Sequence, residues 1–278
     1  MNEKPMFSVG RALAYLFSAL IAASCFFPLV WMFFASFKTK VEVLATPLKV
    51  FPDNWIYDNF QKIIYDPQNP IFHAILMTFL VAGLAVVFSL AVNMMAAYVF
   101  ARLDFYGKRI LWAYSVITMY IPGITILITS FLVVRSLNML DTFLVILVPG
   151  LAGGYSIFFF RQFFLNVPNE LEDAARIDGC GRFRIFCTVF VPLSVTPMVV
   201  LGAGIFIAYW NSFLWPSITI TNKQLQQIMP LIRSFQTEYG TEYGRIMAAG
   251  CIAVLPPIIL FSFFQKYIIK GFILSGLK

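Results

Sequence analysis

The chain has 278 residues, of which 60% are hydrophobic and 12% are charged, and its formal net charge at pH 7 is +7. In a soluble domain roughly a quarter of the residues are charged. This composition therefore excludes an ordinary soluble protein and indicates an integral membrane protein. The positive charge points to anionic membrane lipid rather than to nucleic acid as its counterpart.

Long apolar windows account for most of the chain. A helix needs about 20 apolar residues to span a bilayer, and because hydrocarbon offers a bare peptide group no partner, each such window is expected to be helical. The predicted fold class is therefore all-α, with six transmembrane helices. The first window is too long for a signal peptide and no clear cleavage site follows it, so we expect it to be retained. The six charge-free windows are Ala12–Ser36, Ala74–Phe100, Ile110–Val134, Thr142–Phe160, Ser194–Trp215 and Ile246–Phe264.

The positions of Lys and Arg predict how the bundle is oriented. With the N-terminus in the cytoplasm, the cytoplasmic segments hold more of the 20 Lys and Arg residues than the outer segments do. The loop Arg102–Arg109 and the basic residues within 169–193 favour this N-in/C-in arrangement, whereas Lys38 and Lys40 count locally against it.

Two longer loops then lie outside, Phe37–His73 and Pro216–Arg245, and neither is long enough to form a domain. Helix breakers within three windows predict kinks, which serve either packing geometry or hinges along a pathway. Small residues in two windows predict close contact between helices. The breakers are Pro122-Gly123, Pro149-Gly150 and Pro256-Pro257, and the small residues are Gly150, Gly154 and Gly202-Ala203-Gly204.

One charged segment interrupts the apolar windows, with the sequence NELEDAARIDGCGRFRIFCTVFVPL over residues 169–193. Asn169 is predicted to cap a short helix, with Glu172 three residues on completing a capping box. Gly179 stands where a helix commonly ends in a left-handed residue. A second helical stretch follows over Arg182–Val191, and Pro192 ends it. The segment therefore predicts two short helices joined by a glycine turn on the cytoplasmic side.

Two interpretations of this segment remain open from the residues alone. An amphipathic helix pair could rest in the lipid headgroups, which the Arg residues next to Phe183 would suit. Against this, the first helix is acidic at Glu170, Glu172 and Asp173, and an anionic membrane surface would repel it. The acidic helix with exposed Ala residues favours a docking element for another protein.

The segment 169–193 resembles the EAA loop of ABC-importer permeases. That pattern has Glu-Ala-Ala, three residues, Gly, nine residues, Ile, one residue and Leu-Pro, and this chain matches its spacing with Asp173-Ala174-Ala175, Gly179, Val189 and Val191-Pro192. The departures, Asp for Glu and Val for Ile and for Leu, are conservative. From Phe33 to Lys278 the chain is similar to the carbohydrate type, specifically the smaller membrane subunit of maltose-type sugar transporters. The segments carrying this are FPDNWIYDNF, AAYVFARLDFYGKR, YIPGITILI, FFFRQFF, WNSFLWP, SFQTEYGTEYGRIMAAG and QKYIIKGFILSGLK.

The resemblance implies a fold and three parts of the chain. The fold would be that of a type I ABC importer permease, also called MetI-like. Residues 1–71 would hold the first transmembrane helix and an outer loop, residues 72–265 the permease core with the coupling loop at 169–193, and residues 266–278 a cytoplasmic tail.

The resemblance also implies partners and a mechanism. A second permease subunit in a heterodimer, two cytoplasmic ATPase subunits and an extracytoplasmic solute-binding protein would complete a sugar or oligosaccharide importer in the bacterial inner membrane. The importer would work by alternating access driven by the ATPase. No GxxxxGK[ST] phosphate loop occurs in the sequence, so we expect this permease subunit to be no enzyme and to bind no cofactor, with ATP and Mg held by the partner ATPases.

Site residues carried over by this resemblance fall into three groups. The ATPase-coupling residues would be Glu172, Asp173, Ala174, Ala175, Asp178, Gly179 and Arg182. The tail facing the ATPases would contribute Ser275, Gly276 and Lys278. The binding-protein contact would involve Gln236, Tyr239 and Tyr243.

Polar residues inside the windows suggest a solute path. Sugars are recognised by hydrogen bonds and aromatic faces, so the path candidates are Tyr120, Asn93, Tyr209, Trp210 and Asn211. Asn93, Tyr209 and Asn211 could equally hydrogen-bond neighbouring helices.

Two other classes of function are weaker interpretations. An ion-coupled secondary transporter of small solutes usually places ionisable groups near the membrane midplane, and the six windows contain none. A membrane enzyme or a His-rich metal site is disfavoured because His73 is the single histidine. The four cysteines, Cys25, Cys180, Cys187 and Cys251, show no CxxC pairing and are expected to fill apolar space.

Overall fold

The computed structural model describes residues 9–237 and 240–276, and side chains over 10–236 and 241–267. The described chain divides into two compact units. Unit 1 combines the residues up to Ile71 with Ile232–Leu255, and unit 2 combines Phe72–Leu231 with the residues from Pro256 onward.

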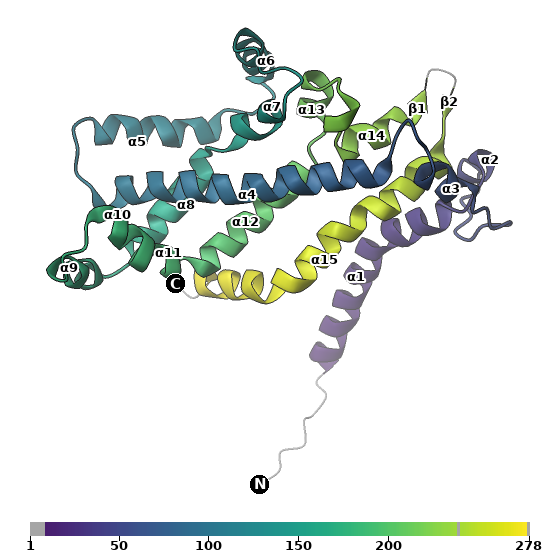
Figure 1. The fold of residues 1–278 in the computed structure, drawn as a ribbon. Coiled ribbons are helices and arrows are strands. Elements are labelled where there is room, and N and C mark those ends of the chain that lie inside the picture. Colours follow the sequence, from purple (N-terminus) through teal and green to yellow (C-terminus); the bar gives the residue numbers. More distant parts are fainter. Residues whose placement is uncertain (1–8, 238–239, 277–278) are drawn as a thin grey trace. The chain divides into compact units, whose positions relative to one another are not determined.

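Helices dominate the described chain (Figure 1). The longer helices are α1 (Val9–Ala35), α4 (Ile71–Arg102), α5 (Lys108–Ile117), α6 (Leu127–Ser136), α8 (Gly154–Leu165), α9 (Asn169–Ile177), α12 (Val195–Trp210) and α15 (Tyr243–Gly276). The shorter ones are α2 (Lys40–Val43), α3 (Asp58–Ile64), η1 (Thr118–Tyr120), α7 (Phe143–Leu147), η2 (Val148–Gly150), α10 (Arg182–Ile185), η3 (Phe186–Phe190), α11 (Val191–Leu193), α13 (Leu214–Thr219), η4 (Lys223–Leu225) and α14 (Ile228–Ser234).

One small departure from an all-α fold lies in unit 1, between α14 and α15. Strands β1 (Gln236–Thr237) and β2 (Gly240–Thr241) pair in an antiparallel register, with Gln236 opposite Thr241. Two-residue strands are too short to leave a periodic signal in the sequence, and the predicted all-α fold class is confirmed apart from this hairpin.

Three described helices are long and apolar enough to cross a membrane, namely Gly10–Ala35, Ile71–Arg102 and Tyr243–Tyr267. Two further candidates are bent pairs. Phe143–Gly150 meets Gly154–Leu165 at 46°, and Arg182–Leu193 meets Val195–Trp210 at 80°. Up to five spans are thus found among the described residues, and a six-span topology stays a prediction.

The predicted window Ile110–Val134 is not one continuous helix. It consists of α5, η1 and α6, with a non-helical interval over residues 121–126. Pro122 lies in this interval; proline lacks a backbone N–H and disfavours the α conformation at the residue before it. The Pro122-Gly123 pair therefore interrupts the helix where the sequence predicted a kink.

Asn93 of α4 supports the break between α7 and α8. Its Nδ2 donates to the Leu151 carbonyl at 2.8 Å and to the Ser89 carbonyl at 2.6 Å, and its Oδ1 accepts from the Gly153 N–H at 2.9 Å. The hydroxyl of Ser89 also donates to the Leu151 carbonyl, at 2.8 Å. Two backbone groups that the break removes from a regular helix thereby find partners on α4.

Side chains from α12 and α13 donate to backbone carbonyls of α7, on the other side of the same break. The Tyr209 hydroxyl donates to the Leu147 carbonyl at 3.0 Å, and Trp215 Nε1 donates to the Val145 carbonyl at 2.8 Å. This approach is possible because residue 150 is glycine: a Cβ there would lie 2.3 Å from the Tyr209 hydroxyl oxygen. The expected close contact at the small residues is confirmed here.

A second close approach occurs between α5 and α8. A Cβ on Gly154 would lie 2.5 Å from the Ser115 carbonyl oxygen of α5. The other end of unit 2 has a buried core shared by α4, α8, η3 and α12, with Tyr98, Phe164 and Phe190 among its largest members. This core underlies the segment 169–193.

Candidate functional site

Helix α9 begins one residue earlier than the sequence predicts. Pro168 occupies the cap position and no side chain caps the first turn. The Asn169 Oδ1 accepts a hydrogen bond from the Arg102 guanidinium instead. The predicted capping box is therefore wrong, because a cation from α4 takes the oxygen that would have capped the helix.

The C-terminal end of α9 agrees with the prediction. Gly179 has a φ of 79° and so lies in the left-handed region. The N–H of Cys180 donates to the Ala175 carbonyl and the N–H of Gly179 donates to the Arg176 carbonyl, both at 3.0 Å. This pair of bonds is a Schellman motif, which satisfies the last carbonyls of a helix. The tight glycine turn is confirmed.

Three predicted coupling residues, Asp173, Ala174 and Asp178, lie on one exposed face. We call this face the α9 surface, and it also includes the exposed residues Leu171 and Ile177. The Asp173 side chain is 62% exposed and Ile177 is 86% exposed. A small methyl side chain at Ala174 leaves the backbone approachable between an acid and two exposed apolar side chains. This combination suits contact with a protein groove better than with an anionic membrane surface.

Glu172 points the other way from the α9 surface. It is 5% exposed, so it is not available to a partner protein. Its Oε1 accepts from Arg176 Nη2 at 2.6 Å within the same helix, and its Oε2 lies 3.9 Å from Arg102 Nε. The structure thus separates Glu172 from the other predicted coupling residues and assigns it a buried ion pair.

Arg102, the last residue of α4, is a functional candidate that sequence reasoning missed. Its Nη2 donates to the Phe164 carbonyl at 2.6 Å and to the Val167 carbonyl, and its guanidinium carbon lies 5.1 Å from the centroid of the Phe190 ring. In the sequence, Arg102 was interpreted only as one of the positive charges that predict the orientation of the helices in the membrane. The feature of the sequence that could have identified Arg102 is its position as a single cation at the end of a long apolar helix, just before a loop.

The second short helix of the segment is less regular than predicted. It consists of α10, a π-helical turn η3 and α11, and the chain then bends by 80° into α12. Arg182 at its start is exposed and Ile185 and Phe186 are buried. Arg182 therefore lies on the surface near Gly179, as the coupling assignment requires, while Ala175 is half-buried against the core.

Among the predicted path residues, Tyr209 lines a cavity of about 280 Å³. The cavity lies between the 121–130 segment, the α7–α8 break and the end of α12. Its polar side chains come from Ser130, Tyr209 and Ser212, and apolar side chains such as Ile126 and Trp215 form most of the rest.

The remaining path candidates lie elsewhere. Asn93 is buried and bonded to the α7–α8 break, so it supports helix packing. Trp210 is 1% exposed and stacks on Phe206 with ring centroids 5.6 Å apart. Tyr120 is 81% exposed and Asn211 is also exposed, and neither lines the cavity of Tyr209.

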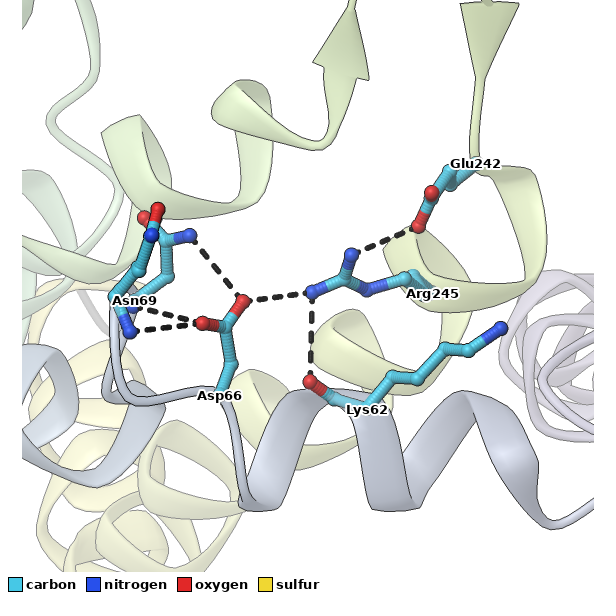
Figure 2. Close-up of polar contacts among 6 residues, drawn as sticks. Lys62, Asp66, Asn69, Glu242 and Arg245 are labelled. Atoms are coloured by element: carbon cyan, nitrogen blue, oxygen red, sulfur yellow. Dashed lines mark hydrogen bonds and ion pairs between the residues drawn. The ribbon is translucent and has the colours of Figure 1, made fainter.

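Arg245 is the centre of a polar cluster in unit 1 (Figure 2). It donates to Asp66 Oδ2 and to Glu242 Oε2, each at 2.9 Å, and its guanidinium lies 4.5 Å from the centroid of the Phe235 ring. The Arg245 and Asp66 side chains are only 17% and 16% exposed. The cluster therefore ties the loop after α3 to the start of α15, beside the β1–β2 hairpin.

The electrostatics at Asp66 favour its ionised form. Burial raises the pKa of this carboxyl, but hydrogen bonds from the Asn69 side chain, the Gln68 N–H and Arg245 outweigh burial and hold the pKa below its ordinary value of 3.8. Asp66 is therefore an anion at neutral pH and a fixed partner for Arg245.

The other predicted outer and tail residues are only partly described. Gln236 lies on β1 and is exposed, and Tyr243 is the first residue of α15 and half-buried. Tyr239 and Lys278 lie outside the described residues. Ser275 and Gly276 end α15, and their side chains are outside the described set.

The chain is similar to known proteins over most or all of its length. Residues 93–273 match the model described as "Binding-protein-dependent transport system inner membrane component". The chain is 30% identical to the "Arabinooligosaccharides transport system permease protein AraQ" of Bacillus subtilis (strain 168), with 100% of this chain and 99% of that protein covered. It is also 30% identical to the "sn-glycerol-3-phosphate transport system permease protein UgpE" of Escherichia coli O1:K1 / APEC, with 89% and 90% covered.

A solved structure gives a further likeness. It is titled "Crystal structure of a bacterial ABC transporter involved in the import of the acidic polysaccharide alginate", and one of its chains superposes with a TM-score of 0.80 at 20% identity. The superposition covers 95% of this chain and 99% of that chain. At this identity the likeness establishes a shared fold.

The Arg245 cluster predicts a pH-dependent contribution to stability. Asp66→Asn should destabilise the protein by about 1–3 kcal/mol at pH 7, because it leaves the partly buried Arg245 guanidinium without the more buried of its two carboxylate partners. A depressed pKa stabilises the fold above the ordinary value of 3.8 and loses that contribution as pH falls through the folded-state pKa. The difference in the free energy of unfolding between Asp66→Asn and the parent protein should therefore become smaller below pH 3.8. Thermal unfolding of the purified protein in detergent measures this.

The matched control is Asp58→Asn, which removes an ion pair with Lys62 in which both side chains are more than half exposed. Exposed pairs of this kind contribute about 0–1 kcal/mol. The assignment of Asp66 as the buried partner of Arg245 would be contradicted if Asp58→Asn destabilised the protein as much as Asp66→Asn does. It would also be contradicted if the destabilisation by Asp66→Asn did not vary with pH.

Proposed function

The chain belongs to the family of binding-protein-dependent transport system inner membrane components, and from this membership we propose how it works within its transporter. It is a multi-pass permease of the bacterial inner membrane, with several apolar spans and the MetI-like fold. It is part of an ABC importer for sugars, oligosaccharides or glycerol 3-phosphate, together with an ATPase and a solute-binding protein, and it is not itself an ATPase.

The composition of the complex and the topology are the finer parts of the proposal. This chain is one of two different permease subunits, and two ATPase subunits bind on the cytoplasmic side. Six spans cross the membrane, with both termini in the cytoplasm. The distribution of Lys and Arg supports this orientation, and it places the segment 169–193 on the ATPase side and the Arg245 cluster on the binding-protein side.

One observation carries the coupling role: α9 presents Asp173, Ala174 and Asp178 outward and ends in a Schellman turn at Gly179. A short, acid-bearing helix with a small residue at its centre fits a groove on the ATPase. ATP binding would close the ATPase dimer, and α9 would move with the subunit that holds it. The spans then change from an inward-open to an outward-open arrangement, which receives solute from the binding protein.

We infer from the Tyr209 cavity that the cargo is a neutral sugar or oligosaccharide. Among the described residues that line the cavity, none is charged, whereas Ser130, Tyr209 and Ser212 offer hydroxyl groups. Phosphate or uronate groups are usually bound by Arg, Lys or a helix N-terminus. An uncharged, partly aromatic lining suits sugar hydroxyls and sugar rings.

The coupling role is tested at the turn. Gly179→Val should weaken binding of the ATPase subunits about tenfold and lower uptake, because a side chain at positive φ is strained by roughly 1–2 kcal/mol and would reorient α9, while the permease still inserts. The control is Gly181→Val, since Gly181 has a φ of −71° and open space around it. Co-purification of the ATPase subunits with tagged permease, together with uptake into cells, is the measurement. Parental levels of ATPase binding and of uptake in Gly179→Val would contradict the assignment of α9 as the docking helix.

The topology is tested by labelling. In a variant lacking the four native cysteines, a cysteine at Lys40 should react with a membrane-impermeant maleimide in intact spheroplasts. A cysteine at Lys108 should react only after the membrane is opened. The reverse pattern would refute the N-in/C-in arrangement.

The cargo is tested with the assembled transporter. Its solute-binding protein, loaded with arabinotriose as the neutral probe, should stimulate ATP hydrolysis in proteoliposomes several-fold. The same protein incubated with glycerol 3-phosphate should leave hydrolysis near its basal rate. Stimulation by glycerol 3-phosphate alone would show that an anionic solute is carried and that the cavity has been misread.

A further inference from the structure

We propose that Arg102 is the positioning residue that joins α9 to the membrane helices α4 and α8, so that a force on the α9 surface reaches both spans. The proposal rests on the coupling role of α9 proposed above. Its subject, however, is a different step: how movement of α9 is passed on after the ATPase has bound.

Apolar burial holds α9 only weakly. Among the residues of α9, Glu172 is the one that is buried, and Ala175 is half-buried against the core. One alanine methyl buries little apolar surface, and stabilisation scales with that area. Leu171 and Ile177, the larger apolar residues of the helix, are exposed. The attachment of α9 to the rest of unit 2 therefore depends on polar contacts.

Arg102 supplies those contacts from a single guanidinium. It reaches the Phe164 carbonyl in the last turn of α8, the Val167 carbonyl in the loop that follows, and the Asn169 side chain at the start of α9. A cation is also favoured at this position by the dipole at the C-terminus of α8. The Arg102 side chain is 8% exposed, so its bonds to the two carbonyls are partly shielded from water, whereas its bond to Asn169 is exposed.

Glu172 completes the joint from the side of α9. Its carboxylate is buried, and a buried carboxylate needs cationic or hydrogen-bonding partners. Arg176 is half-exposed and belongs to the same helix, so its bond to Glu172 cannot tie α9 to another element. Arg102 approaches from α4 at 3.9 Å. Between these two cations, Arg102 is the one that connects helices.

Lysine could not reproduce this arrangement. A guanidinium is planar and has five N–H donors in a fixed fork, whereas an ammonium group is a compact point charge at the end of a flexible chain. In Arg102→Lys the charge near Glu172 would remain, but the simultaneous bonds to Phe164, Val167 and Asn169 would not. With the joint loosened, α9 would still present the α9 surface to the ATPase, yet its displacement would no longer carry α4 and α8 with it.

The test uses the complete transporter in proteoliposomes, with its partner permease, ATPase subunits and solute-binding protein. The variants are Arg102→Lys and Glu172→Gln, each of which changes one side of the joint. The control is Asp104→Asn, which removes a fully exposed carboxylate paired with Lys108 just beyond the end of α4. The probe is arabinotriose or glycerol 3-phosphate, whichever stimulates ATP hydrolysis in the cargo experiment.

Two quantities are measured: the probe molecules imported per ATP hydrolysed, and the amount of ATPase subunit that co-purifies with the permease. Both joint variants should lower the import-to-hydrolysis ratio at least fivefold while the ATPase subunits remain bound at the parental level. Asp104→Asn should stay within twofold of the parent. A merely structural role would lower assembly and hydrolysis together and leave the ratio of the surviving transporters unchanged.

An import-to-hydrolysis ratio within twofold of the parent for either joint variant overturns the proposal. Loss of the ATPase subunits from both variants also overturns it, because Arg102 would then be needed only to form the docking surface. Failure of the docking assignment shows itself differently, in undiminished ATPase binding by Gly179→Val. The two failures are therefore seen in different variants and by different measurements.

Discussion

Hydrocarbon provides no hydrogen-bond partner for a peptide group, and the described structure of this permease depends on how that requirement is met where helices break. The break between α7 and α8 would leave several backbone groups bare. Asn93 from α4 and Tyr209 from α12 bond to the Leu151, Gly153 and Leu147 backbone groups instead. Asn93 and Tyr209 thus replace helical hydrogen bonds that are lost at this break, and Tyr209 also lines the cavity.

The need to pair backbone groups with hydrogen-bond partners also applies where the end of α4 meets the end of α8. The last carbonyls of a helix lack intrahelical partners. At the end of α8 the Arg102 guanidinium donates to the Phe164 carbonyl, which also accepts from the Val167 N–H, and to the Val167 carbonyl. Because the guanidinium has donors left over, it also binds Asn169 and lies beside Glu172. A local need for hydrogen bonds at one helix end therefore brings together α4, α8 and α9. The family to which the chain belongs moves solute through such helices, and this shared contact gives α9 a direct connection to two of them.

Local sequence patterns predicted the parts of the structure that depend on local physics. The long apolar windows predicted α1 and α4 to within three residues at each end, whereas α15 continues from the window 246–264 to Gly276. The position of Gly179 predicted a left-handed turn because a turn depends only on residues close to it in the sequence. The predicted cap at Asn169 failed because its oxygen is taken by Arg102, which is remote in sequence. Glu172 was grouped with the outward-facing acids for the same reason, since a sequence does not show which carboxylate finds a distant cation. The interruption within 110–134 was foreseen as a kink at Pro122-Gly123, but its extent depends on packing around the break.

Position 179 illustrates how the turn constrains the variation open to this protein. Any single-base change in a glycine codon that alters the amino acid introduces Ala, Val, Ser, Cys, Asp, Glu, Arg or Trp, and all of these carry a Cβ. A residue with a Cβ at a φ of 79° is strained, even though no neighbouring atom lies within 4 Å of the place where that Cβ would stand. The intolerance therefore arises from the backbone itself, and repacking of nearby side chains offers no compensating change. The constraint on this residue is therefore torsional, at a site that has ample room.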